Sequence, residues 1–131
     1  MKKVVICSSR IFQKQAQQWK QKLEKLGYNV IKIPILADQN SLEEYKNAHT
    51  SHYKKIVETD ILLVLNIEKN NIPNYVGPSV FAEIAFAIGL NIAFEKNIQI
   101  YCINDLPENS HYAEELKLWK KLNWIKIRKD K

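Results

Sequence analysis

The sequence predicts an α/β fold built on a doubly wound, five-stranded parallel sheet. Two observations indicate this fold. Short, uninterrupted apolar segments are typical of parallel strands buried on both faces, and they alternate along the chain with segments of helical periodicity. Right-handed crossovers then give, most simply, a flavodoxin-like or Rossmann-like strand order of 2-1-3-4-5. The 131 residues contain no repeat, low-complexity tract or linker, so a single domain over residues 1–131 is expected.

The first part of the chain is expected to form two strands around one helix. Residues 4–7 are a continuous apolar segment and form the first strand. Apolar residues then recur at steps of four and three positions over residues 12–26, which predicts a helix, and Gly27 marks its C-terminal end. Residues 28–33 form the second strand, which ends at Pro34.

A second helix and a third strand follow a polar break at residues 38–41. Ser41 and Glu44 have the spacing of a capping box, which predicts that the helix begins there. Residues 61–65 are strongly apolar and form the third strand. The inward face of the second helix is expected to carry the residues at helical spacing: Leu42, Tyr45, His49, His52 and Ile56.

The last part of the chain completes the alternation. Residues 68–76 form a loop that is long enough to act as a lid. A helix over residues 76–90 follows, then a fourth strand over 98–103, a helix around 112–119 and a short final strand over 124–127. The chain therefore supplies the alternating strands and helices that a doubly wound sheet requires.

The helix over residues 76–90 contains one charged residue, Glu83, in an otherwise apolar sequence. Gly77 and Pro78 mark its start, because proline is suited to the first helical position. A helix that is apolar on all sides is normally buried, and a buried carboxylate is costly unless it is compensated. Two interpretations are open. Glu83 either fills a gap in the core and pairs with a lysine or backbone donors, or it lines a pocket and takes part in chemistry.

The predicted strand order brings several polar side chains to one edge of the sheet. In a doubly wound sheet, ligands bind beyond the carboxyl ends of the strands, here between the first and third strands. A Ser-Ser-Arg turn before one helix and the Gly-Pro-Ser start of another indicate an anion site, although a helix cap with a surface arginine explains the turn equally well. The candidate binding residues at the strand exits are Cys7, Ser8, Ser9, Arg10, Asn66, Gly77, Ser79 and Asn104.

A carboxylate beside a phosphate or sugar site favours one type of reaction. Attack of the Glu83 carboxylate on an anomeric carbon gives a covalent glycosyl–enzyme intermediate. The positive end of its own helix is expected to favour the ionised form of Glu83, and apolar walls would exclude competing water. His52 is the candidate general acid or base of the site.

No cofactor is expected, because the turn after the first strand lacks the glycine-rich dinucleotide fingerprint and the chain contains no P-loop. His49 and His52 form an H-x-x-H pair on one helical face, but the spacing places no third metal ligand beside them. No metal site is therefore expected, and packed, hydrogen-bonded histidines are the alternative to a chemical role. Cys7 and Cys102 each end an apolar segment and are expected to be reduced core thiols.

Composition and charge narrow the range of partners. No apolar segment approaches the roughly 20 residues that span a bilayer, and the N-terminal apolar stretch is typical of a first strand, not of a signal peptide. A cytoplasmic protein with no membrane partner is therefore expected. The net charge of +6 comes from lysines spread over the helices and the C-terminus, without a nucleic-acid-binding motif. Such a field favours anionic small ligands such as nucleotides over a specific nucleic acid.

Three segments of the chain resemble the nucleoside 2-deoxyribosyltransferase-like superfamily, which includes deoxyribosyltransferases and deoxynucleoside 5'-monophosphate N-glycosidases. These segments are C-S-S-R over residues 7–10, H-Y-K-K-I-V-E-T-D-I-L-L-V-L-N over 52–66 and N-Y-V-G-P-S-V-F-A-E-I-A-F-A-I-G-L over 74–90. The last is the most specific, because it combines a glycine-containing loop with a glutamate in a helix of small and apolar residues. The resemblance extends from residue 3 to about residue 118.

This resemblance implies cleavage or transfer of the N-glycosidic bond of a nucleoside or (deoxy)nucleotide. It places the nucleophile on Glu83, the phosphate- or sugar-binding turn on residues 8–10 and the loop before the nucleophile on residues 77–79. It also implies a homodimer or higher homo-oligomer, in which Asn104 of a neighbouring subunit completes the site. Where catalytic members carry an aspartate that helps to protonate the leaving base, this chain has His52.

The departure at His52 leaves open a function of a different class. The chain would then be a non-catalytic nucleotide-binding module, such as a sensor, that keeps the pocket. Turnover of a nucleoside or nucleotide distinguishes the enzyme from the module. A plain nucleic-acid-binding domain is a third possibility, and it predicts steeply salt-dependent binding to DNA or RNA.

Overall fold

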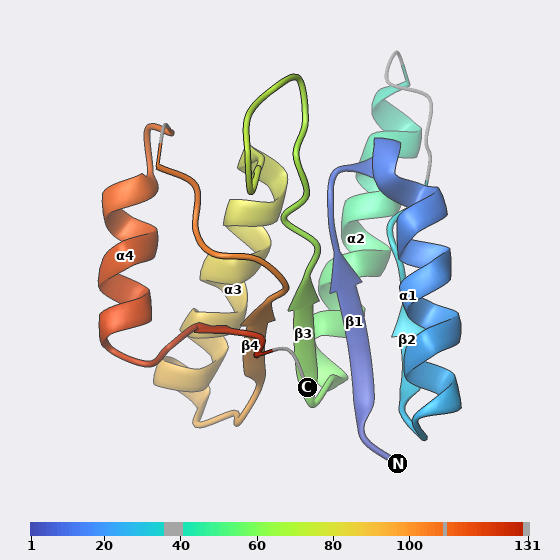
Figure 1. Ribbon diagram of the computed structural model, residues 1–131. Coiled ribbons are helices and arrows are strands. Elements are labelled where there is room, and N and C mark those ends of the chain that lie inside the picture. The colour runs from blue at the N-terminus through green and yellow to red at the C-terminus, as the bar shows by residue number, and fades with distance from the viewer. Residues whose placement is uncertain (36–40, 109, 130–131) are drawn as a thin grey trace.

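The computed structural model describes residues 1–35, 41–108 and 110–129. It confirms the predicted fold, a five-stranded parallel sheet in the order β2-β1-β3-β4-β5 (Figure 1). Residues 38–40 of the predicted polar break lie outside the described residues. The strands are β1 (Lys3–Cys7), β2 (Asn29–Lys32), β3 (Ile61–Val64), β4 (Gln99–Cys102) and β5 (Lys126–Ile127). The helices are η1 (Arg10–Phe12, a 3-10 turn), α1 (Gln13–Lys25), α2 (Leu42–Glu58), α3 (Pro78–Phe94) and α4 (Ala113–Lys121).

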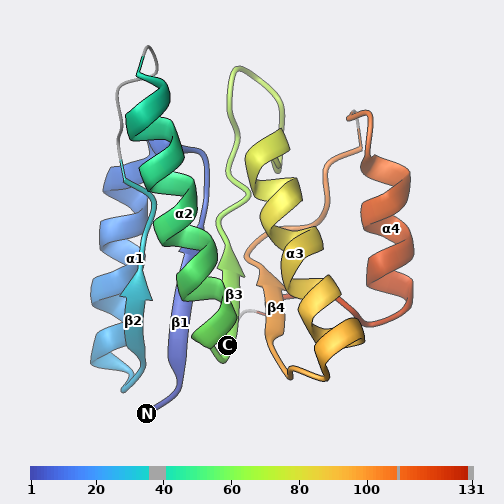
Figure 2. The ribbon, with the colours of Figure 1, turned by 180° about the vertical axis from the view of Figure 1, so that it is seen from behind.

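The helices cover the two faces of the sheet unequally. Figure 1 shows α1 on the near side of the sheet, and Figure 2, seen from behind, shows α2 and α3 across the other side. Side chains of a strand alternate between the faces. Val4 and Ile6 of β1 therefore pack in the core beside α1, whereas Val5 and Cys7 belong to the larger core beneath α2, α3 and α4. Cys7, the last residue of β1, thus points toward α2 and α3.

The carboxyl ends of the three central strands lie level with one another. In the sheet register, Cys7 of β1 pairs with Val64 of β3, which in turn pairs with Cys102 of β4. Helices α2 and α3 have 17 residues each and are about 25 Å long, about twice the length of a four-residue strand. Their N-terminal turns therefore extend past the carboxyl edge of the sheet and form walls above it.

One expectation for α2 is wrong. The helix is capped as predicted, since the Ser41 hydroxyl accepts a hydrogen bond from the Glu44 backbone N–H at 3.2 Å. His52 is buried on the inward face as expected, but Leu42 is 85% exposed and Tyr45 is 49% exposed. The first turns of α2 project beyond the strands, so these side chains lie above the sheet edge instead of packing on it.

The segment between β3 and α3 forms a compact hairpin. Lys69 and Ile72 exchange two backbone hydrogen bonds of 3.1 and 2.9 Å. The two residues between them, Asn70 and Asn71, have positive φ angles of 50° and 63°, as a type I′ turn requires. A backbone hydrogen bond from Tyr75 closes the base of the hairpin. The segment predicted as a lid therefore has a defined shape, seen at the top of Figure 1.

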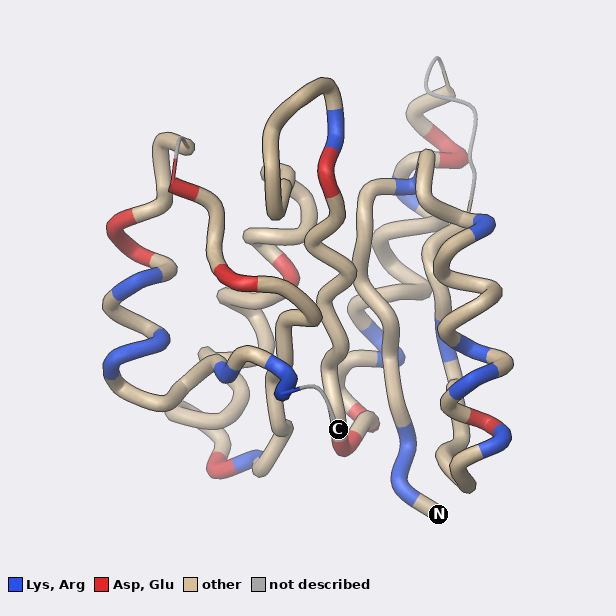
Figure 3. The backbone as a smooth tube through the Cα atoms, in the orientation of Figure 1, with Lys and Arg blue, Asp and Glu red and all other residues tan. Residues whose placement is uncertain are grey.

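Charge is distributed over several elements. Figure 3 shows lysine and arginine along α1, along α4 and near the C-terminal end of the described chain. No single element therefore accounts for the net charge of +6. Among the described residues, no helix combines the length and the apolar character needed to cross a membrane.

Candidate active site

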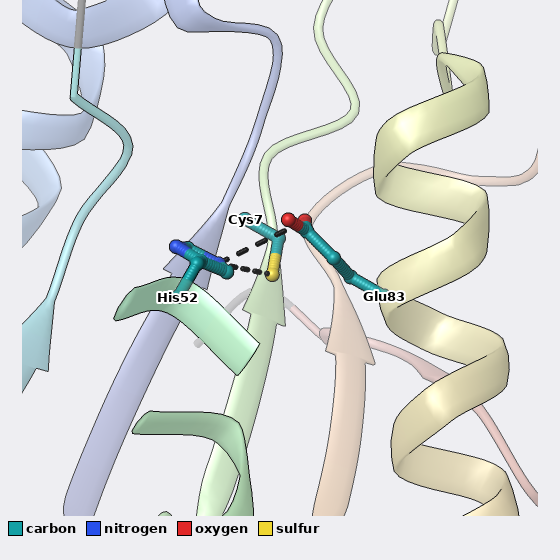
Figure 4. Close-up of side chains that lie close together, drawn as sticks. All are labelled: Cys7, His52 and Glu83. Carbon is teal, nitrogen blue, oxygen red and sulfur yellow. Dashed lines mark hydrogen bonds and ion pairs between the residues drawn. The ribbon is translucent and has the colours of Figure 1, made fainter. Parts of the chain in front are cut away.

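Three side chains from three different elements meet at the carboxyl end of β1 (Figure 4). Cys7 ends β1, His52 comes from α2 and Glu83 from α3. The Nε2 atom of His52 lies 3.2 Å from the Sγ atom of Cys7 and 3.7 Å from the Oε1 atom of Glu83. None of the three residues is more than 7% exposed. Cys7, His52 and Glu83 are called the buried cluster below.

The local sequence explains why each member of the buried cluster points inward. Cys7 faces α2 and α3 because side chains alternate along a strand. Glu83 lies on the inward side of α3, since Val80, three positions earlier, and Ala87, four positions later, are buried too. His52 is buried where α2 crosses the end of β1. The structure thus gives Glu83 a thiol and an imidazole as neighbours.

Burial determines the charge state of the cluster. Loss of solvation raises the pKa of Glu83 to about 7, and a hydrogen bond from the Cys7 thiol opposes that rise. The pKa of His52 is lowered to about 4, mainly by burial and to a lesser extent by the positive charges of Lys32 and His49. Burial and the negative charge of Glu83 raise the pKa of Cys7 well above its ordinary value. Near neutral pH the cluster therefore holds a neutral imidazole, a protonated thiol and a partly ionised carboxyl group.

These pKa values bear on two points: whether His52 and Glu83 form an ion pair, and whether the helix dipole keeps Glu83 ionised. The 3.7 Å contact between His52 and Glu83 is an ion pair only when His52 is protonated, and the lowered pKa of His52 makes that form scarce at neutral pH. The expectation that the helix dipole keeps Glu83 ionised is wrong. Glu83 lies in the second turn of α3, beyond the first turn where the dipole acts, and burial raises its pKa.

A cavity of about 310 Å³ opens above the buried cluster, and this volume is within the range of small-molecule sites. The structure brings seven of the predicted site residues together around it: Ser8, Ser9, Arg10, His52, Gly77, Ser79 and Glu83. The cavity also has lining residues that the sequence did not single out as binding residues: Pro34, Ile35, Tyr45, Ala48, His49, Lys69, Tyr75, Pro78 and Val80. The carboxyl and imidazole groups of the cluster thus face a space that a small molecule can enter.

Groups suited to an anion gather at the rim of this cavity. The Nζ atom of Lys69 lies 3.0 Å from the Ser9 hydroxyl oxygen and 5.0 Å from the centre of the Tyr75 ring. Arg10 follows Ser9 directly, at the start of η1. Helix α3 begins after Gly77, which has no side chain to cap the first N–H groups of the helix. Ser9, Arg10, Lys69 and the N-terminus of α3 are called the cationic rim below, because such groups bind phosphate and carboxylate oxygens.

The Ser-Ser-Arg turn does not serve as a helix cap. Ser9 occupies the position before η1, but its side chain makes no capping hydrogen bond. The Ser8 hydroxyl donates to the Ser9 carbonyl oxygen at 2.9 Å, while the Ser9 hydroxyl meets Lys69. The helix-cap interpretation of this turn is therefore excluded for Ser9, and its role in an anion site stays a prediction.

Three predicted binding residues lie outside the cavity lining. Cys7 is fully buried beneath it, and Asn66 and Asn104 join the exit of β3 to the exit of β4. The Asn66 side-chain amide donates to the carbonyls of Asn104 and Asp105, both at 2.9 Å, and its oxygen accepts from the Asn104 N–H at 3.1 Å. These contacts make Asn66 a structural residue within the chain. The contribution of Asn104 across a subunit interface stays a prediction.

The two histidines of the H-x-x-H pair have different surroundings. The ring of His49 is 4.1 Å from that of Tyr45 and 6.2 Å from that of Tyr53, measured between centroids. His52 instead contacts Cys7 and Glu83. Cys7 is free and buried as predicted, but it contacts His52, a neighbour that the spacing of the sequence did not indicate. The alternation of residues along β1 was the signal that places its thiol on the α2 side.

Lys69 is the main functional candidate that the sequence did not single out. It lies in a polar segment of Glu, Lys and Asn residues whose composition suggests only a solvent-exposed loop. Its position depends on the Asn70-Asn71 turn, which folds the segment back so that the lysine reaches Ser9. The adjacent asparagines, which adopt positive φ more readily than other residues, were the available signal.

No protein-family model matches this chain, and no curated protein matches it. The resemblance to the nucleoside 2-deoxyribosyltransferase-like superfamily therefore stays a prediction based on the three segments quoted above.

Proposed function

We propose that this protein cleaves or transfers the N-glycosidic bond of a nucleoside or nucleotide, with Glu83 as the nucleophile. The observation that carries the proposal is the position of Glu83, a buried carboxyl group that faces a cavity with a cationic rim. A carboxylate placed below an anion site is the arrangement needed to attack the sugar of a bound nucleotide.

The rest of the cavity supports recognition of the other parts of such a ligand. The cationic rim offers hydroxyl, ammonium and guanidinium donors to phosphate or sugar oxygens. Ile35, Tyr45 and Tyr75 give the lining apolar and aromatic surface, against which a planar base can pack. The cavity thus contains both types of surface that a nucleoside or nucleotide requires.

The proposed reaction proceeds in two balanced steps. An oxygen of the ionised Glu83 carboxylate bonds to the anomeric carbon, the carbon–nitrogen bond breaks, and its electron pair and a proton from solvent or a nearby acid go to the base. Water, or the nitrogen of a second base, then attacks the same carbon. The bond to Glu83 breaks, the carboxylate is regenerated, and the proton of the attacking group is released. Hydrolysis and transfer differ only in the second nucleophile.

His52 is suited to a positioning role in this reaction. Its lowered pKa, about 4, leaves it neutral at physiological pH, so it is a poor source of the proton for the leaving base. Its Nε2 atom contacts both the Glu83 carboxyl group and the Cys7 thiol. In this proposal His52 helps to orient the nucleophile, and its neutral imidazole can accept a proton but rarely supplies one at physiological pH.

The direct test incubates the protein with a panel of nucleosides, deoxynucleosides and their 5'-monophosphates, and measures free base by chromatography. We expect release by the wild type and its loss in Glu83→Gln. Glu114→Gln, a change of an exposed glutamate on α4, is the matched control and should retain activity. Equal release by wild type and Glu83→Gln, or no release from any member of the panel, would overturn the proposal.

A specific observation supports the alternative function, a non-catalytic nucleotide-binding module. The Glu83 carboxyl group already contacts the Cys7 thiol and the His52 ring, an arrangement that also suits a structural group. Calorimetry separates the two functions. Tight binding of a nucleotide without release of base favours the module, whereas turnover that depends on Glu83 favours the enzyme.

A further inference from the structure

We propose that Cys7, His52 and Glu83 form a binding site for a thiophilic divalent cation such as Zn²⁺. A Cys Sγ atom, a His nitrogen and a carboxylate oxygen of the three residues all lie within 4.8 Å of one another. Cys7 Sγ and His52 Nε2 are 3.2 Å apart, and His52 Nε2 lies 3.7 Å from Glu83 Oε1. Ligand atoms around tetrahedral zinc are separated by roughly 3.3–3.8 Å, given Zn–S and Zn–N bonds of about 2.3 and 2.0 Å. Small side-chain movements therefore suffice for all three to bind one ion.

The types of donor favour zinc over the hard cations. A thiolate and an imidazole are ligands for Zn²⁺ and other transition metals, whereas Mg²⁺ and Ca²⁺ prefer oxygen ligands throughout. Three protein ligands leave a fourth coordination position for water or an exogenous group, as in zinc sites that are not closed by protein. His52 and Glu83 line the cavity and Cys7 lies beneath it, so the ion can enter from the cavity.

The fold holds the three donors before any ion binds. They come from the end of β1, the middle of α2 and the second turn of α3, which are elements of the core and not loops. All three are buried, so a bound ion would replace solvation that the carboxyl group and thiol have lost. Binding exchanges the proton of the Cys7 thiol, and that of Glu83 where present, for the cation, and the protons leave to solvent.

Such an ion would also control the chemistry proposed above. A cation bound to one Glu83 oxygen withdraws electron density from the whole carboxylate and so makes its other oxygen a weaker nucleophile. Cation binding is therefore expected to inhibit base release, and chelation to restore it. This consequence rests on the proposed function, whereas the binding of the ion does not.

Cobalt serves as the spectroscopic probe of the site. The chelator-treated, full-length protein is titrated with Co²⁺, and absorption is recorded for visible bands of tetrahedral Co²⁺ and for the near-ultraviolet thiolate-to-metal band. We expect both sets of bands, saturation at one ion per chain, and their loss when Zn²⁺ is added. Cys7→Ser should remove the thiolate band, and His52→Gln should weaken binding at least tenfold.

Two matched variants test whether the bands come from this cluster. Cys102→Ser changes the other buried thiol and His49→Gln changes the other histidine of the pair, so both should retain the bands of the wild type. Circular dichroism checks that every variant is folded, and Cys7→Ala replaces Cys7→Ser if the serine variant is not. Absence of a thiolate band in the wild type, or its persistence in both Cys7 variants, would overturn the site.

The test separates failure of this inference from failure of the proposed function, because absorption requires no turnover. If the protein shows the bands but releases no base, the metal-site proposal stands and the proposed glycosidic function fails. If the protein releases base but shows no bands, only the metal-site proposal fails. A protein that does both, yet is equally active with and without saturating Zn²⁺, contradicts the inhibitory role.

Discussion

The buried cluster lies at the base of the cavity and the cationic rim lies at its edge, and different kinds of element hold the two. Cys7, His52 and Glu83 are fixed by the core, at the end of a strand and within two helices. Ser9, Arg10 and Lys69 lie in a turn, in η1 and in a hairpin, and are only partly buried. Under the proposed function, this difference corresponds to a division of roles. The core would position the reacting carboxyl group, while the surface segments would determine which ligand is held above it.

The largest effect on the rate of base release is expected from substitution of Glu83 in the buried cluster. Glu83→Gln removes the proposed nucleophile but keeps the shape of its side chain, so kcat for base release should fall about a thousandfold or more. Binding of the same nucleotide, measured by calorimetry, should change little, because the rim is intact. A Glu83→Gln variant that keeps kcat but loses affinity would show that the carboxyl group belongs functionally with the rim.

Substitution of Asn66 tests whether this polar residue at the sheet edge stabilises the fold or binds the ligand. Asn66→Ala leaves two carbonyls and one N–H group without their partner, and we expect the free energy of unfolding to fall by about 3 kcal/mol. Asn47→Ala, at an exposed position on α2, is the control and should cost little. Urea denaturation measures both. An Asn66→Ala variant of wild-type stability with a large rise in KM would instead assign Asn66 to ligand binding.

The pH dependence of stability follows from the opposite pKa changes within the cluster. The pKa of Glu83 is raised from 4.5 to about 7 on folding, so the stability linked to this group is fully present below pH 4.5 and is lost as the pH rises through 7. Relative to Glu83→Gln, the wild type should therefore lose about 2–3 kcal/mol between pH 5 and pH 8. Urea denaturation of chelator-treated protein at both pH values measures the difference.

His52 has the opposite dependence. Its pKa is lowered from 6.5 to about 4, so its contribution is present above pH 6.5 and is lost as the pH falls through 4. Between pH 4.5 and 6.5 the two contributions partly cancel in the wild type, and Glu83→Gln should expose the acid-side loss caused by His52. Parallel curves for wild type and variant over the whole range would show that Glu83 is not buried as described.

A smaller effect, on KM rather than on kcat, is expected from substitution in the cationic rim. Lys69→Ala removes a charged donor beside Ser9, and KM for a 5'-monophosphate should rise roughly tenfold or more while kcat changes little. The unphosphorylated nucleoside should be affected less. Lys117→Ala, on the exposed surface of α4, is the matched control. A fall in kcat with unchanged KM for Lys69→Ala would contradict the assignment of ligand binding to the cationic rim and of catalysis to the buried cluster.

The sequence predicted those features that depend on periodicity. Alternating apolar strands and amphipathic helices gave the sheet order, and the single carboxylate in an apolar helix pointed to Glu83. The same period-two rule, applied to β1, also places the Cys7 thiol on the side of α2 and α3. Distances between side chains on different elements, such as that from Cys7 to His52, depend on tertiary packing and have no signal in a linear pattern.

Side-chain exposure, charge state and loop position could not be predicted, because they depend on element lengths, desolvation and turn geometry and not on residue periodicity. The exposure of Leu42 and Tyr45 follows from the different lengths of helix and strand, which periodicity ignores. The charge state of Glu83 follows from desolvation, because Glu83 lies beyond the first turn of α3, where the helix dipole acts. The approach of Lys69 to Ser9 depends on the turn at Asn70-Asn71, whose geometry moves a polar loop onto the rim.

The most direct test of the central claim is to trap the covalent intermediate. The protein is incubated with a 2'-deoxy-2'-fluoroarabinosyl nucleoside or its 5'-monophosphate, whose fluorine slows hydrolysis of the glycosyl ester, and is then quenched and digested for mass spectrometry. The proposed mechanism predicts a mass increase equal to the fluorosugar (phosphate) on the peptide that contains Glu83, and its absence in Glu83→Gln. Release of base without any adduct, or an adduct on a different residue, would contradict it.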